Sequence, residues 1–274
     1  MVTGPGCTSR PVWHSATAIC KGSSMKRVLL SMIFAALAVG NAFALDLESM
    51  SDEDRAIFRA EIRDYLLENP EVLMEAFAVL EQRREQEAAS LDLAMLDRNR
   101  DAIFNDGYSF VGGNPDGDVT IVEFLDYRCG FCKRAFPAVK ELLATDGNIR
   151  LIVKEFPILG EESTLAARYA LAAKKTDGDE AYQTIHDTLM AHNGSINAGF
   201  LARTSRQLGL DHGAIAEEMQ SEEITTLINT NRALAQQLQI QGTPSFIMGE
   251  NFVRGFVELD QMRAIVNQIR AEKG

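Results

Sequence analysis

The sequence predicts an α/β protein in which a helical insertion interrupts the sheet-forming part and a helical arm precedes it. A β-branched, apolar run from Val119 to Tyr127 leads into two cysteines and then into a helix-forming stretch, Lys133 to Ala144. Helical signals fill residues 161–240, between the second strand and the next β-like stretch. The chain then returns to strand chemistry and closes with a helix, so we expect one α/β domain around the cysteines.

The first 44 residues predict an upstream extension followed by a cleaved signal peptide. Two basic residues follow Met25, an apolar run covers Val28 to Val39, and the motif Ala42-Phe43-Ala44 resembles a cleavage site. The apolar run is shorter than the roughly 20 residues that a membrane span needs. We therefore expect a mature chain that begins at Leu45 and is periplasmic.

The expected mature chain is strongly acidic. The first 44 residues hold four basic and no acidic side chains, so the rest carries 23 basic against 39 acidic groups, a net charge of −16. This charge disfavours nucleic acid and anionic membranes as partners. The length is sufficient for a medium-sized domain with an accessory segment.

Residues 45–106 predict the helical arm. Ser51 is expected to cap a first amphipathic helix, and Asn69-Pro70-Glu71 is expected to end it and to start a second, with Asn69 as the new cap. The second helix has no Gly or Pro up to Asp106, but its apolar face is interrupted from Glu81 to Glu87. We expect the apolar residues before this interruption to mediate self-association, with docking onto the same chain as the alternative.

The predicted chemistry lies in Cys129-Gly130-Phe131-Cys132. Because the motif lies where a strand meets a helix, the free N–H groups and the helix dipole favour a thiolate at Cys129. Cys132 lies one turn into the helix and should be more shielded, so Cys129 attacks and Cys132 resolves the mixed disulfide. Gly130 and Phe131 add no charge, which predicts a milder oxidant than an enzyme with histidine between its cysteines.

The other interpretations of such a pair are half of a zinc site or a structural disulfide. A structural zinc site usually needs four ligands, and the other cysteines, Cys7 and Cys20, precede the predicted cleavage point. The remaining histidines, His186, His192 and His212, show no ligand spacing with the pair. We therefore expect a reactive thiol pair that needs no metal and no cofactor.

The charged residues in the predicted strands include Glu123 and Lys154. Glu123 lies in the strand before the cysteines, where burial would raise its pKa and let it accept the proton of Cys132. The pattern alone is equally compatible with a solvent-facing Glu123. Lys154 lies in the next strand, Ile149 to Phe156, and either supports the site by pairing with Glu123 or marks an edge strand. The helix between the two strands predicts a parallel pair.

The remaining elements are predicted from turn and cap residues. Tyr108 to Val111 is expected to form a short edge strand, and Gln241 to Met248 begins a hairpin that continues to Arg254. A cis bond is one explanation for Pro244 at the start of a core strand. Glu258 to Lys273 predicts the closing helix. Within the insertion, the residues expected to begin or cap helices are Ser163, Asp179, Asn197, Asp211 and Ser221.

This order of elements is similar to the DsbA-like branch of the thioredoxin superfamily, over Tyr108 to Gly274. The likeness rests on four motifs in combination, which are Glu123-Phe124, the Cys-x-x-Cys motif, Lys154-Glu155-Phe156-Pro157 and Gly242-Thr243-Pro244-Ser245-Phe246. It implies a thioredoxin fold in residues 107–274, with the helical insertion at about 161–240.

The resemblance also implies roles for individual residues. Pro244 would be a cis-proline that faces the disulfide, Thr243 would offer backbone hydrogen bonds to a substrate strand, and Glu123 would be the buried proton acceptor. With Gly130 and Phe131, they form the expected substrate-binding surface. Gly-Phe and Thr-Pro differ from the Pro-His and Val-Pro of the oxidase DsbA and are more similar to oligomeric isomerases. The arm is similar to that of ScsC-type proteins, in which such an arm trimerises.

These observations predict an exported thiol-disulfide oxidoreductase that isomerises or reduces non-native disulfides in folding proteins. Its expected partners are unfolded or misoxidised exported proteins and a membrane thiol reductase of the DsbD kind. We expect a homo-oligomer, with a trimer favoured. One alternative is a monomeric oxidase that a DsbB-like enzyme recharges. Another is a chaperone or interaction module whose disulfide is structural.

Overall fold

The computed structural model describes residues 50–273. The predicted upstream extension and signal peptide, with the cleavage motif at residues 42–44, lie outside these residues. The chain divides into two units, Met1–Met74 and Glu75–Gly274. Within the described range, no helix combines the length and the apolar character needed to cross a membrane.

The described part of the first unit contains helix α2 (Asp52–Glu68). The Ser51 hydroxyl accepts a hydrogen bond from the backbone N–H of Asp54, which confirms Ser51 as the N-cap. The side chain of Asn69 donates to the carbonyl of Tyr65, so Asn69 caps the end of α2. The expectation that Asn69 caps the start of the next helix is therefore wrong. The helix buries none of its residues, and its exposed large apolar side chains are Ile57, Phe58, Ile62, Tyr65 and Leu67.

Helix α3 (Glu71–Arg98) begins at the end of the first unit and continues into the second. The expected uninterrupted helix to Asp106 is wrong, because Asn99 separates α3 from the short helix α4 (Arg100–Phe104). The polar middle of α3 is exposed, whereas Leu96 near its end and Ile103 in α4 are fully buried. The C-terminal end of the predicted arm therefore packs into the core of the second unit.

The second unit contains the sheet and the remaining helices. In chain order these elements are β1 (Phe110–Gly113), β2 (Val119–Leu125), α5 (Gly130–Asp146), β3 (Ile149–Glu155), α6 (Glu161–Asp177), α7 (Asp179–Ala191), α8 (Ala198–Leu208), α9 (His212–Glu218), α10 (Glu222–Gln237), β4 (Ser245–Met248), β5 (Asn251–Arg254) and α11 (Leu259–Lys273).

The five strands form one sheet in the order β1-β3-β2-β4-β5. Strands β2 and β3 are parallel and α5 connects them, as the sequence predicts. The other neighbours are antiparallel, and β4 and β5 form the expected hairpin. The central strand β2 delivers the chain directly to the N-terminus of α5, and this connection positions the two cysteines.

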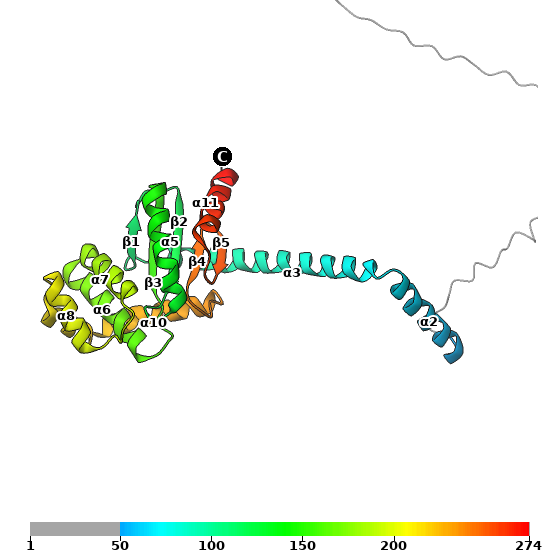
Figure 1. The fold of residues 1–274 in the computed structure, drawn as a ribbon, viewed down its shortest axis with the longest axis horizontal. Coiled ribbons are helices and arrows are strands. Elements are labelled where there is room, and N and C mark those ends of the chain that lie inside the picture. The colour runs from blue at the N-terminus through cyan, green and yellow to red at the C-terminus, as the bar shows by residue number, and fades with distance from the viewer. Residues whose placement is uncertain (1–49, 274) are drawn as a thin grey trace, which may run out of the picture. The chain divides into compact units, whose positions relative to one another are not determined.

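The two faces of the sheet bury different side chains. Ile121 and Leu125 of β2 pack in one cluster with residues of α5, α6, α7 and α11. Val122 and Phe124, which alternate with them, pack in another cluster with residues of α3, α4 and α10. This alternation is the period of two that a strand imposes on its side chains. Figure 1 shows α5 lying along the sheet, with α6, α7 and α8 grouped beside the β1 edge.

The insertion between β3 and β4 consists of five helices, α6 to α10, as predicted. Asn197, Asp211 and Ser221 accept backbone N–H groups as N-caps, and α7 begins at Asp179. The expectation that Ser163 caps the first helix is wrong. Gly160 is the N-cap of α6, and Ser163 is fully buried inside its first turn.

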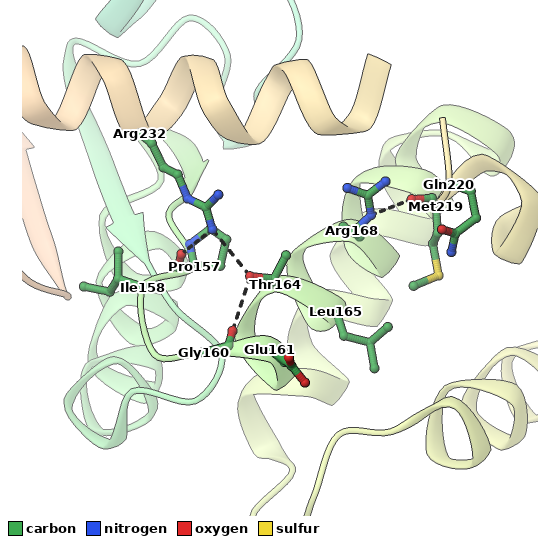
Figure 2. A pocket seen from close by; sticks show the side chains of 10 residues that line it. All are labelled: Pro157, Ile158, Gly160, Glu161, Thr164, Leu165, Arg168, Met219, Gln220 and Arg232. Carbon is green, nitrogen blue, oxygen red and sulfur yellow. Dashed lines mark hydrogen bonds between the residues drawn. The ribbon is translucent and has the colours of Figure 1, made fainter. Parts of the chain in front are cut away.

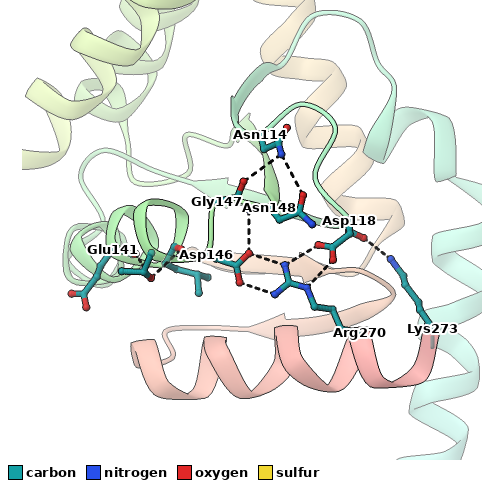
Figure 3. A network of polar contacts seen from close by, with 10 residues as sticks. Asn114, Asp118, Glu141, Asp146, Gly147, Asn148, Arg270 and Lys273 are labelled. Atoms are coloured by element: carbon teal, nitrogen blue, oxygen red, sulfur yellow. Dashed lines mark hydrogen bonds and ion pairs between the residues drawn. The ribbon is translucent and has the colours of Figure 1, made fainter.

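The closing helix α11 is fastened by Arg270 (Figure 3). Its guanidinium donates two hydrogen bonds to Asp118, just before β2, and two to Asp146, at the end of α5. Lys273 adds a hydrogen bond to the carbonyl of Asp118. These contacts hold the last helix against the same strand and helix that carry the thiol motif.

Candidate active site

The two cysteines lie where the sequence predicts, at the start of α5. Cys129 is the N-cap residue and Cys132 is one turn into the helix. Both are free thiols, with side chains that are largely buried, and Cys132 is the more enclosed of the two. The backbone N–H groups of the first turn have no partner within the helix, so they are available to the sulfur of Cys129.

The environment separates the proton affinities of the two thiols. The hydrogen bond from Cys132 lowers the pKa of Cys129 to about 5, against burial, with help from Thr243 and from the backbone N–H groups of Cys132 and Phe131. The same hydrogen bond raises the pKa of Cys132, as do burial and the nearby carboxyl of Glu123. At neutral pH, Cys129 is therefore the nucleophile and Cys132 holds its proton.

The loop before β4 faces the first cysteine. The bond between Thr243 and Pro244 is cis, as the family resemblance implies. The sulfur of Cys129 lies 3.1 Å from the carbonyl oxygen of Thr243, to which it donates a hydrogen bond only while the thiol is protonated. A shallow pocket of about 390 Å³ lies along this loop. Its lining residues are Gln239, Gln241, Gly242, Thr243, Pro244, Ser245, Arg254 and Gly255.

Glu123 is buried on the same face of the sheet as the cysteines. Its neighbours in β2, Val122 and Phe124, belong to the opposite face, so its side chain lies on the side of α5. The residue is 3% exposed, and burial raises the pKa of its carboxyl to about 8. The solvent-facing alternative for Glu123 is therefore wrong.

Lys154 does not pair with Glu123, which corrects one of the two expectations for it. Its ammonium donates to the carboxylate of Asp106 at 2.5 Å and to the carbonyl of Ala102 at 2.8 Å. The side chain of Lys154 is fully buried. The physical reason is register: Lys154 pairs with Phe124, so it points to the face opposite Glu123. Strand β3 is also interior to the sheet, so the edge-strand alternative is wrong.

Apolar side chains are exposed around the thiols. Phe131 is 56% exposed, and its ring lies near the ring of Phe256 and the guanidinium of Arg134. Ile158 and Leu159, in the loop after β3, are also exposed. Such a surface suits extended, apolar protein segments. Gly130 has open space where a side chain would begin.

A carboxylate that the sequence did not single out holds the loop that presents Ile158. Asp126 accepts hydrogen bonds from the backbone N–H groups of Arg128, Ile158 and Leu159, at 2.7 to 3.0 Å. The sequence feature that could have indicated this role is the position of Asp126, three residues before Cys129 and at the end of a buried strand.

A pocket of about 680 Å³ lies beside that loop (Figure 2). Figure 2 shows Arg232 and Arg168 reaching toward it from α10 and α6. Arg232 donates to the carbonyl of Pro157, and Arg168 donates to that of Met219. Arg232 thus fastens the loop after β3, and Arg168 fastens the end of α9.

Next to the thiol site lies a buried cluster that the sequence motifs did not predict, formed by Glu155, Tyr127, Tyr182 and His186. Tyr127 lies just after β2, Glu155 is the last residue of β3, and the other two residues belong to α7. They are joined by hydrogen bonds, and all four are at most 7% exposed. The sequence signal was the acid in Lys154-Glu155-Phe156, which follows an apolar strand.

Among residues 50–273, no group of three or more His, Cys, Asp or Glu side chains is arranged to hold a metal ion. The thiol site itself consists of two thiols, a buried carboxyl and a cis-proline loop.

Two family models match the chain. The DSBA-like thioredoxin domain matches residues 120–267, and the copper resistance protein ScsC N-terminal domain matches residues 54–87. Among curated proteins, the Na(+)/H(+) antiporter NhaA 1 of Salinispora arenicola is 29% identical over 157 residues, which are 57% of this chain and 24% of the antiporter. The chain thus spans about a quarter of the length of that relative.

Solved structures match over more of their length. A thioredoxin-like oxidoreductase from Silicibacter pomeroyi is 44% identical, with a TM-score of 0.59 over 63% of this chain and 98% of that one. A linker-deletion mutant of Proteus mirabilis ScsC is 26% identical, with a TM-score of 0.63 over 82% and 98%. The thiol-disulfide exchange protein α-DsbA2 from Wolbachia pipientis is 29% identical, with a TM-score of 0.62 over 67% and 98%.

The match to the thioredoxin-domain model covers more than half of the chain and contains both cysteines and the cis-proline. With the strand order and the helical insertion described above, it shows that this chain belongs to the DsbA-like thioredoxin family.

Proposed function

We propose that the protein is a thiol-disulfide oxidoreductase that reduces or isomerises non-native disulfides in folding proteins. The observation that supports this most directly is that the two thiols at one helix N-terminus have very different pKa values. Cys129 is held as a thiolate, and Cys132 keeps its proton one turn away. A structural disulfide, the alternative from another functional class, has no need of that asymmetry.

The proposed reaction begins when the Cys129 thiolate attacks one sulfur of a substrate disulfide. A bond forms between Cys129 and that sulfur, and the other substrate sulfur leaves with the electron pair of the broken bond. Cys132 then transfers its proton to the carboxylate of Glu123 and attacks Cys129. The enzyme disulfide forms, and the substrate sulfur leaves as a second thiolate. Alternatively, a substrate thiolate resolves the mixed disulfide and the substrate is isomerised.

The loop at Thr243 and Pro244 is proposed to hold the substrate. Because the Thr243 carbonyl already lies 3.1 Å from the sulfur of Cys129, a substrate strand that pairs with this loop would place its own sulfur near the nucleophile. The exposed ring of Phe131 and the side chain of Ile158 would contact apolar residues that flank the substrate cysteine.

The proposed direction is reduction and isomerisation, because isomerisation needs the dithiol form. The stabilised Cys129 thiolate favours the dithiol over the disulfide. The same stabilisation would make the disulfide form a competent oxidant, and this observation favours the second candidate, a monomeric dithiol oxidase recharged by a DsbB-like enzyme. For the first candidate, we propose a membrane thiol reductase of the DsbD kind as the electron donor and exported, misoxidised proteins as substrates.

We propose that the protein is a homo-oligomer, with the trimer favoured by its resemblance to ScsC. Large apolar side chains are exposed in α2 and in the first half of α3, where Leu73 is 45% and Phe77 is 65% exposed. The match to the ScsC N-terminal domain covers the same stretch, residues 54–87. Sites held in an oligomer would be shielded from a general oxidase.

The test is refolding of a scrambled, multi-disulfide substrate by the wild type and the Cys129→Ser variant. We expect the wild type to restore native disulfides and the variant to have no more effect than buffer. Full activity in Cys129→Ser would contradict the proposal. Fast oxidation of a reduced peptide, together with negligible isomerisation, would select the oxidase alternative.

A further inference from the structure

A second buried carboxyl lies beside the thiol site and takes no part in the mechanism above. Glu155, the last residue of β3, is 1% exposed. Its Oε1 accepts hydrogen bonds from the hydroxyls of Tyr127 at 2.7 Å and Tyr182 at 2.6 Å. Its Oε2 is one of two buried side-chain polar atoms without a hydrogen-bond partner in the described part of the chain.

The hydrogen bonds of this cluster all run toward Glu155. Tyr127 gives its only hydroxyl proton to Glu155, so its oxygen accepts from Nδ1 of His186, 3.1 Å away. His186 is then the neutral tautomer with its proton on Nδ1, consistent with burial, which lowers its pKa to about 4. Donors that converge on one carboxyl favour its ionised form.

Glu155 lies near Glu123, the proposed proton acceptor. Glu123 pairs with Val153, and Leu125 pairs with Glu155, so the two carboxyls lie on neighbouring strands and on the same face of the sheet. Two residues so related have Cα atoms roughly 8 Å apart. No side-chain hydrogen bond stabilises the Glu123 carboxyl among residues 50–273, whereas Glu155 has two.

The surroundings contain acids but no cation that pairs with Glu155 in the described part of the chain. Burial raises the pKa of Glu155 to about 8, although Tyr127 and Tyr182 lower it, and the charges of Asp126 and Glu123 raise it further. The charge of Glu123 raises the pKa of Glu155, so the two carboxyls titrate as a pair. The two tyrosine hydroxyls that donate to Glu155 favour the first negative charge on that carboxyl.

We propose that Glu155 is a positioning residue that acts on Cys132 through Glu123. The tyrosines place the first negative charge of the pair on Glu155, and this charge holds the proton affinity of Glu123 near that of a thiol. The inference rests on the proposed thiol exchange but not on its direction. In resolution, Cys132 gives its proton to Glu123 as its sulfur bonds to Cys129. In the reverse step, Cys132 leaves and recovers that proton from Glu123. Glu155 itself exchanges no proton.

A purely structural role is the alternative, because a satisfied polar network also makes a core rigid. The two roles differ in what they do to pH dependence. Removal of a negative charge near Glu123 and Cys132 stabilises their ionised forms and lowers the pKa of both. Loss of rigidity alone lowers the free energy of unfolding and leaves the pH midpoint of resolution unchanged.

The test measures the resolving step in isolation. Cys129 of the full chain is converted to a mixed disulfide with 5-thio-2-nitrobenzoate, and the release of this group by Cys132 is followed by absorbance at a series of pH values. We expect Glu155→Gln to move the midpoint of the rate profile to lower pH by about one unit. Tyr182→Phe, which keeps the carboxyl but removes one donor, should move it in the same direction by less.

Two matched controls should keep the wild-type midpoint. Glu141→Gln neutralises an exposed carboxyl of α5, and Tyr169→Phe removes a buried hydroxyl that contacts Ser205 and not Glu155. If Glu155→Gln folds and keeps the wild-type midpoint or has a higher one, the proposal is overturned. If Glu155→Gln does not fold, an unchanged or higher midpoint in Tyr182→Phe overturns it. Failure of wild-type Cys129 to form the mixed disulfide would instead contradict the proposed function.

Discussion

The reactivity of Cys129 depends on donors that converge on one sulfur atom. The thiol of Cys132 is the largest contribution to the low pKa of Cys129, ahead of Thr243 and the backbone N–H groups of Cys132 and Phe131. The second cysteine therefore does more than resolve the mixed disulfide, because it also stabilises the thiolate that forms it.

Replacement of Cys132 should consequently make Cys129 less acidic. In Cys132→Ala, we expect the pKa of Cys129 to rise by about one unit or more, because a donor to the ionised form is lost. Cys132→Ser keeps a hydroxyl donor and should show a smaller rise. Thiolate absorbance or the pH dependence of alkylation measures the pKa of Cys129. Equal midpoints in the wild type and Cys132→Ala would disprove this assignment of the main donor.

The pair of Lys154 and Asp106 is the second residue-scale feature, and it concerns stability. Burial alone would raise the pKa of Asp106, but the hydrogen bond and charge of Lys154 outweigh it and the pKa is lowered. Because the ammonium of Lys154 is fully buried, its carboxylate partner is needed to offset its desolvation.

Removal of that partner should destabilise the fold strongly. We expect Asp106→Ala to lower the free energy of unfolding by about 3 to 5 kcal/mol, since it leaves a buried ammonium unpaired. Asp97→Ala is the control, because it removes an exposed pair with Arg100 and should have little effect on the free energy of unfolding. Urea titration measures both, and similar losses in the two variants would count against the buried pair.

Local sequence predicted the reactive residues better than it predicted their partners. The helix start at Cys129 and the cis-proline loop follow from contiguous motifs. The partner of Lys154 does not, because Asp106 lies 48 positions away and the choice depends on which face β3 presents. The strand register places Lys154 and Glu123 on opposite faces of the sheet, which excludes Glu123 as the partner of Lys154. That register is known only once the strands are paired.

At the scale of elements, helix α11 is held by one residue at two places. Arg270 joins Asp118 at the start of β2 to Asp146 at the end of α5. The hydrogen bond from Arg270 is the largest cause that lowers the pKa of each carboxyl. A carboxyl with a lowered pKa stabilises the fold above its unfolded pKa, and this contribution is lost as the pH falls through its folded pKa.

Loss of Arg270 should therefore matter at neutral pH and not in acid. We expect Arg270→Ala to lower the free energy of unfolding by about 1 kcal/mol at pH 7, a modest value because the group is partly solvated. The difference from the wild type should shrink as the pH falls through the lowered pKa values of Asp118 and Asp146, and vanish where both carboxyls are protonated. Arg263→Ala, on the same helix with exposed partners, is the control. A deficit that persists in acid would contradict the ion-pair explanation.

Element boundaries were predictable where a cap residue marks them and were wrong where tertiary packing decides. Asn197, Asp211 and Ser221 each begin a helix as expected. Ser163 has the same chemistry but lies inside α6, because the helix starts at Gly160 and buries that hydroxyl. The sequence around the break at Asn99 contains no proline or glycine that would predict it.

At the scale of the whole molecule, the exposed apolar residues of the arm support the proposed oligomer. If α2 and the first half of α3 bury these residues between copies, charges placed among them should dissociate the oligomer. We expect Leu73→Glu with Phe77→Glu to give the monomer mass by light scattering. Gln82→Glu with Gln86→Glu adds the same charge in the polar middle of α3 and should keep the wild-type mass. A wild type that is already monomeric at micromolar concentration would contradict self-association.

In the proposed reaction, Cys129 attacks substrate disulfides and Cys132 resolves the product. It is tested most directly by incubating Cys132→Ala with a scrambled disulfide protein and mapping any covalent complex by mass spectrometry. We expect a mixed disulfide at Cys129 that accumulates in this variant, disappears on reduction and does not form with Cys129→Ser. An absent complex, or disulfide rearrangement that persists in Cys129→Ser, would contradict it.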